Sequence, residues 1–145
     1  MESKAIKYGL MLISFLLVVG ANLPSFAQTP LKMETVVTNS ETSKTPVTTF
    51  APTTEKIYLN WQAQGLRVGQ KIKAVWIADD THGAAPNNYK VVESSVDVGK
   101  ELKDSGMVGT FSASKPTAGW PVGDYHVEIY VDSNLANNTK FSIVK

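Results

Sequence analysis

The sequence predicts an all-β protein built as an antiparallel β-sandwich of about seven short strands. Three observations support this fold class. Apolar and polar residues alternate with a period of two along most of the chain, and no segment keeps apolar residues at helical spacing over three turns. Clusters of turn-forming residues separate the alternating segments at short intervals. The chain has no cysteine, so apolar packing must hold the two layers together without a disulfide.

The first expected strand is 32–38, which contains the strand-like run METVV within the threonine-rich segment 28–55. Phe50 is a large apolar residue, which is not expected in a solvated linker. We therefore expect an edge strand, followed by a polar turn and a kink at Pro46. The alternative is that 28–55 is a free linker, which its threonine and proline content would also allow.

The next two strands, 56–63 and 70–78, alternate most regularly. They place Trp61 and Trp76 on inward faces. Because an aromatic side chain removes about 150–250 Å² from water, we expect Trp76 to form the centre of the core.

The remaining strands are 89–98 and 109–114, which alternate weakly, and then 124–131 and 140–144, which direct Ile129 and Phe141 inward. The intervening turns are expected at 64–69, 82–88, 114–123 and 132–134.

Residues 1–27 have the features of a secretory signal peptide. Two lysines precede an apolar run at 10–19, and small residues lead up to a cleavage position after Ala27. The alternative, an uncleaved membrane anchor, would need about 20 apolar residues. We therefore expect cleavage, a single mature domain over 28–145 without a membrane span, and a periplasmic or secreted location.

Composition and motifs exclude several classes of function. The chain carries 14 basic and 13 acidic residues, a balance that lacks the basic footprint of a nucleic-acid-binding protein. The lack of cysteine rules out thiolate catalysis and zinc–thiolate sites. There is no Gly-x-Ser-x-Gly motif and no glycine loop that opens a helix. We expect no enzymatic activity and no cofactor.

The segment Gly119-Trp120-Pro121-Val122-Gly123-Asp124-Tyr125 indicates a tyrosine corner, in which a hydroxyl at the start of a strand bonds to the upstream backbone. Together with 48–52 (TTFAP), 74–76 (AVW) and 141–144 (FSIV), this segment resembles small bacterial secreted or lipoprotein modules of immunoglobulin-like type, often without assigned function. The resemblance implies an immunoglobulin-like fold and an envelope location, and it brings no catalytic residues. Lipid-anchored members have a cysteine after the signal peptide, which this chain lacks, so a soluble mature form is implied.

Candidate contact residues lie on the outward face of two strands. If Trp76 points inward, Val75 and Ile77 point outward, and on 124–131 the outward set includes His126 and Tyr130. These strands are neighbours in immunoglobulin-type sandwiches, so Val75, Ile77 and Tyr130 could form an exposed apolar patch flanked by charge, which is typical of an interface. Trp120 has two interpretations, a lid over the open end of the core or an exposed aromatic contact.

The densest polar cluster, Asp79, Asp80 and His82, follows the strand that carries Trp76. It is a weak metal candidate, because calcium takes six to eight oxygens and zinc three or four ligands. Adjacent aspartates more simply end a strand.

The sequence therefore predicts an exported, non-enzymatic immunoglobulin-like module that binds an envelope protein, another copy of itself or a surface polymer. One alternative is a carbohydrate-binding module with two or three coplanar exposed aromatics. A metal-binding envelope protein is the other. Pairing between exposed edge strands is a further route to self-association.

Overall fold

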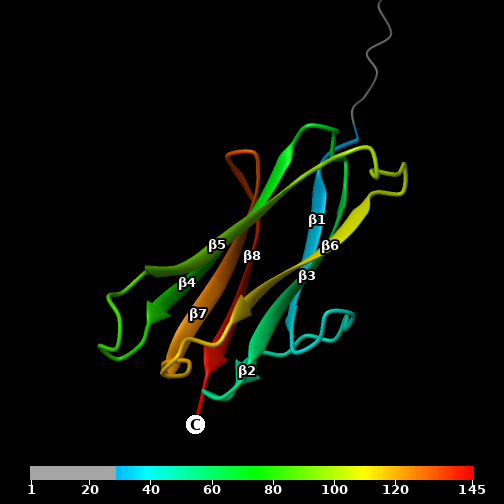
Figure 1. Ribbon diagram of the computed structural model, residues 1–145. Coiled ribbons are helices and arrows are strands. Elements are labelled where there is room, and N and C mark those ends of the chain that lie inside the picture. The colour runs from blue at the N-terminus through cyan, green and yellow to red at the C-terminus, as the bar shows by residue number, and fades with distance from the viewer. Residues whose placement is uncertain (1–28) are drawn as a thin grey trace, which may run out of the picture.

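The computed structural model describes residues 29–145, which form two β-sheets packed face to face (Figure 1). The signal peptide predicted at 1–27 lies outside the described residues. No helix long and apolar enough to cross a membrane occurs within 29–145. The strands are β1 (Lys32–Thr38), β2 (Thr49–Phe50), β3 (Lys56–Gln64), β4 (Lys71–Asp80), β5 (Tyr89–Asp97), β6 (Met107–Ser114), β7 (Gly123–Val131) and β8 (Asn134–Ile143).

One sheet has three strands in the order β1-β3-β6, and the other has five in the order β2-β8-β7-β4-β5. The predicted all-β sandwich is confirmed. The expected edge strand 32–38 is also confirmed, because β1 pairs along its whole length with β3 and has no strand on its other side within its sheet. β4 and β7 are neighbours, as expected for the two strands that carry the candidate patch.

Two details differ from the sequence-based expectation. The chain has an additional two-residue strand, β2, which pairs parallel to the end of β8 and brings Phe50 to the core. β8 begins at Asn134, six residues before the expected start at Lys140. Its first half is mostly polar and exposed, so alternation does not mark it, although its backbone pairs with β7.

The core lies between the sheets and consists mainly of inward residues of β1, β3, β4, β6, β7 and β8, whereas β5 has no buried residue. Trp76 is 1% exposed, which confirms its predicted place. Its indole ring meets Phe141 edge to face at 6.0 Å between centroids, and Phe50 contacts the same phenyl ring from another side at 5.7 Å. This aromatic cluster joins β4, across the central strand β7, to β8 and β2 of the same sheet.

Candidate interaction surfaces

The tyrosine corner predicted at 119–125 is present. The Tyr125 hydroxyl donates to the Pro121 carbonyl at 2.7 Å, and burial raises the pKa of Tyr125 to about 12. Trp120 meets the Tyr125 ring edge to face, is 3% exposed, and donates its indole N–H to the Thr54 carbonyl at 2.9 Å. The interpretation of Trp120 as an exposed contact is therefore wrong, because this side chain is packed and hydrogen-bonded inside the sandwich.

The register of β4 and β7 brings the other four expected contact residues onto one outer face. Ile77 lies opposite His126, and along the same outer face Val75 lies opposite Glu128 and Lys73 opposite Tyr130. Ile77, His126 and Tyr130 are half-buried. Val75 is buried, because it lies between Glu93 on β5 and Glu128 on β7, whose longer side chains flank it. The expected exposed apolar patch is thus corrected: its central valine is not accessible.

Polar groups dominate this outer face and form one continuous chain. The ring nitrogens of His126 lie 2.6 Å from Asp79 Oδ1 and 2.9 Å from Glu128 Oε1. The hydroxyl of Tyr130 donates to the other oxygen of Glu128, and the ammonium of Lys73 lies 5.1 Å from the centre of the Tyr130 ring. Each ring nitrogen of His126 therefore contacts a carboxylate oxygen, one on β4 and one on β7.

The chain of contacts ties β4 to β7. The Tyr130 hydroxyl and then His126 hold the pKa of Glu128 below its usual range, because both hydrogen bonds favour the carboxylate. The same hydrogen bond to Glu128 raises the pKa of Tyr130. Both nitrogens of His126 are engaged, which leaves neither for a metal ion or for the proton of a substrate.

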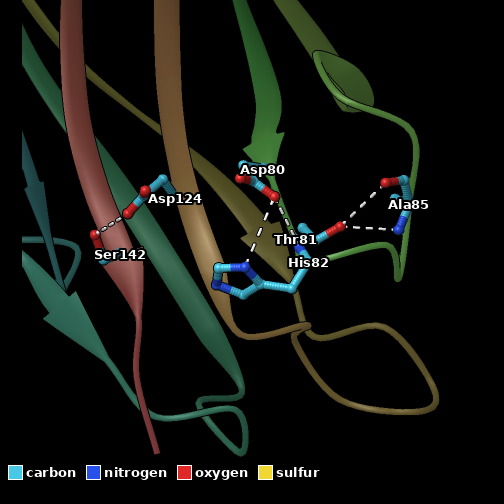
Figure 2. A network of polar contacts seen from close by, with 6 residues as sticks. All are labelled: Asp80, Thr81, His82, Ala85, Asp124 and Ser142. Carbon is cyan, nitrogen blue, oxygen red and sulfur yellow. Dashed lines mark hydrogen bonds and ion pairs between the residues drawn. The ribbon is translucent and has the colours of Figure 1, made fainter.

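The three weak metal candidates do not converge on one point, because Asp79 contacts another strand while Asp80 and His82 contact each other. Asp79 contacts His126, whereas Asp80 accepts the backbone N–H of His82 at 2.8 Å, and the His82 ring nitrogen lies 3.9 Å from the same Asp80 oxygen (Figure 2). Consecutive strand residues point to opposite faces, which explains why the two aspartates separate. Within residues 29–145, no group of three His, Cys, Asp or Glu side chains could hold a metal ion.

The loop after β4 is braced from within, as Figure 2 shows. The Thr81 hydroxyl accepts the Ala85 N–H at 2.8 Å and donates to the Ala85 carbonyl at 3.3 Å. On the neighbouring strands, Ser142 donates to Asp124 at 2.9 Å. The two Thr81 bonds close the turn that follows β4 from within the loop.

A hollow of about 520 Å³ lies where residues 41–44 pass over the outer face of the three-stranded sheet. Asn60 anchors this segment by donating to the carbonyls of Ser40 and Ser43 at 3.0 and 2.7 Å, and Thr110 donates to Asn60 at 2.8 Å. The residues that line the hollow include no histidine or cysteine. The hydrogen bonds to Asn60 hold the loop that covers this hollow against the sheet, so the hollow is the space beneath an anchored surface loop.

The two lateral sides of the sandwich differ. On one side β1 packs along β8. Asn137 on β8 donates to the Met33 carbonyl at 2.9 Å, and the hydroxyls of Thr35 and Thr139 share a hydrogen bond at 2.5 Å. These contacts connect the two sheets and close that side.

The other side is open along β5. This nine-residue strand pairs with β4 on one edge, and within residues 29–145 no strand pairs with its other edge. Its side chains are mostly exposed, including Tyr89 at 51%, Val92 at 36% and Val96 at 37%. The sequence reasoning expected this strand and the possibility of an exposed edge. It did not identify β5 as that edge: the weak alternation of 89–98 agrees with a strand that has no buried face, but it does not give the strand order that leaves β5 at the edge.

Among the comparisons with known proteins, the search of solved structures supports the fold. No protein-family model matches the chain, and no curated protein matches it in sequence. An immunoglobulin-like protein from Pseudomonas aeruginosa superposes with a TM-score of 0.52 at 13% identity, over 81% of this chain and 99% of the other.

Parts of larger enzymes give weaker likenesses. An alkylpurine DNA glycosylase from Pseudomonas fluorescens and β-glucosidase 3B from Thermotoga neapolitana each match with a TM-score of 0.47 and 13% identity. The matches cover 79% and 81% of this chain but only 30% and 16% of those proteins. At 13% identity, the superposition on the Pseudomonas aeruginosa protein shows the immunoglobulin-like sandwich fold alone.

Proposed function

We propose that this protein is an exported, non-enzymatic immunoglobulin-like module of the cell envelope, periplasmic or secreted, that binds a protein partner through the open edge of β5. The observation that carries this proposal is the difference between the two lateral sides. Hydrogen bonds join β1 to β8 on one side, whereas β5 keeps a long unpaired edge on the other.

An unpaired strand edge is a binding surface because its N–H and C=O groups can pair with another extended segment. Such pairing supplies affinity through the main chain, and the side chains that alternate along the strand supply specificity. Lys90 and the bulge opposite Trp76 and Ile77 lie at the beginning of β5. The segment 92–97 has neither proline nor lysine, and its two charged residues, Glu93 and Asp97, are each paired with a lysine, so no proline, bulge or unpaired charge blocks a strand from pairing there.

The carbohydrate-binding alternative needs a platform of exposed aromatic rings. All three tryptophans, Trp61, Trp76 and Trp120, are buried, and Tyr89 is the large exposed aromatic of the described residues. One ring does not make a platform, so we favour a protein partner.

A capture experiment tests this proposal. The exported protein, the Ser95→Pro variant and a Val108→Lys control are immobilised and exposed to an envelope extract. We expect the first and third to retain the same partner and Ser95→Pro to lose it, because proline on the free edge blocks strand addition. Val108 is 74% exposed and lies on the other sheet, so it controls for a changed surface. Equal capture by all three proteins would contradict the role of the β5 edge.

A further inference from the structure

We propose that the occupant of this edge is a second copy of the chain, whose β5 pairs antiparallel with the first around a two-fold axis at Ser94. This inference rests on the proposed function, because it takes the β5 edge as the binding surface and names what binds there. The argument uses the direction of the backbone groups, the register and the charge of the strand.

The free backbone groups of β5 belong to alternate residues. Val98, one residue past the strand, directs both of its backbone groups toward the neighbouring chain, donating to the Gln70 carbonyl and accepting from Gly69 N–H, each at 2.8 Å. Backbone groups alternate in direction along an antiparallel strand. Those of Ser94 and Val96 therefore face β4, and those of Glu93, Ser95 and Asp97 face outward, where residues 29–145 supply no partner strand.

A two-fold pairing must place side chains of the same face opposite each other, so a residue lies on the axis. Three such registers centre on residues 93, 94 and 95, between the bulge at the start of β5 and its end at Asp97. A centre at Glu93 sets the two copies' glutamates opposite each other, and a centre at Ser95 sets Glu93 opposite Asp97. Like charges directly opposite each other destabilise a pair of strands.

The centre at Ser94 avoids both conflicts. It sets Glu93 opposite Ser95 in pairs that exchange outward N–H and C=O groups. It also sets Val92 opposite Val96 on each side of the axis, both on the inner face of the sheet and each more than one-third exposed. Cross-strand pairs of β-branched residues stabilise a sheet, so this register gives the exposed valines an apolar partner.

Charge does not oppose the approach of two copies. Residues 1–27 carry two lysines and one glutamate, so the 14 basic and 13 acidic residues of the chain fall to 12 of each in 28–145. On the outer face of the strand, Glu93 already pairs with Lys90 at 3.1 Å, and Asp97 pairs with Lys71 at 3.5 Å. A single strand pair gives a small interface, so we expect a reversible dimer with a dissociation constant on the order of micromolar or weaker.

Single-cysteine variants test the register, because the chain has no cysteine of its own. Opposed residues at the axis have Cα atoms about 4.5 Å apart in a non-hydrogen-bonded pair, which is within disulfide range. Under mild oxidation we expect the exported Ser94→Cys protein to form a covalent dimer at least about tenfold faster than Ser95→Cys or Val108→Cys. A faster reaction of Ser95→Cys or equal rates for all three would overturn the proposal.

Sedimentation at increasing concentration tests the association itself. We expect the unmodified protein to shift from monomer to dimer and the Ser95→Pro variant to stay monomeric. Its melting temperature should stay near that of the unmodified protein, because the Ser95 N–H makes no bond inside the sandwich. A strictly monomeric unmodified protein would overturn self-pairing. If Ser95→Pro still abolished capture of an envelope partner, the proposed function would stand while this inference would fall.

Discussion

The hydroxyl of Tyr125 provides a quantitative test of the corner that links the 115–122 connection to β7. In Tyr125→Phe the ring keeps its stacked contact with Phe141 at 5.2 Å and its edge contact with Trp120, so the change removes only the hydrogen bond to the Pro121 carbonyl. A buried tie of this kind contributes about 1–1.5 kcal/mol to the free energy of unfolding. For a domain of this size, that loss lowers the melting temperature by about 3–6 °C.

Thermal and urea unfolding at pH 7 measure this effect, with Tyr89→Phe as the matched control because Tyr89 is 51% exposed. An unchanged melting temperature in Tyr125→Phe would show that the hydroxyl does not tie the corner. A loss above about 4 kcal/mol would show that ring packing also changed, which would refute the assignment of the effect to one hydrogen bond.

The same residue predicts how stability changes in alkali. Burial raises the pKa of Tyr125 from 10.0 to about 12, because the folded state disfavours the phenolate. Folding therefore keeps this stabilisation below pH 10 and loses it as the pH rises from 10 to 12. Urea unfolding between pH 9 and 11.5 should show a steeper decline for the unmodified protein than for Tyr125→Phe. Parallel curves would contradict the burial argument.

The remaining predictions concern packing, acid stability and export. Gly109→Ala should lower the free energy of unfolding by about 1–3 kcal/mol in urea titrations, because the added methyl would lie 2.6 Å from Cε2 of Trp61; an unchanged value would contradict this contact. Since hydrogen bonds lower the pKa of Glu128, its stabilisation is present above about pH 4.5 and is lost in more acid solution, so Glu128→Gln should flatten the pH dependence of unfolding between pH 5 and 3. An equally steep dependence in the variant would argue against that network. Mass spectrometry of the exported protein should give a chain that begins at Gln28, and retention of residues 1–27 would contradict the leader.

Alternation predicted most of the strands because every long strand except β5 has one face in the core. Trp76 and Phe141 lie where a period of two places them. The corner around Tyr125 was also predictable, since its glycine, proline and tyrosine encode a local geometry. Local patterns of this kind do not depend on which strand lies beside which.

The missed features depend on tertiary neighbours. Val75 has the outward position that alternation assigns to it, but the glutamates of two adjacent strands flank it. An indole side chain such as that of Trp120 can either cover the end of a core or make an exposed contact. Its hydrogen bond to the Thr54 carbonyl shows that it covers the core, and this partner is distant in sequence. The openness of β5 follows from the strand order and from the β1–β8 contacts on the opposite side, neither of which the sequence of Tyr89–Asp97 contains.

Amide hydrogen exchange, resolved by residue along β5, tests the central claim that this edge is the binding surface. In dilute solution we expect slow exchange at Ser94 and Val96 and fast exchange at Glu93 and Ser95. At concentrations that favour the dimer, Glu93 and Ser95 should become protected while the exposed amides of the 82–88 loop stay unchanged. Protection of Glu93 and Ser95 in the dilute monomer, or no change in their exchange as the dimer forms, would contradict the account.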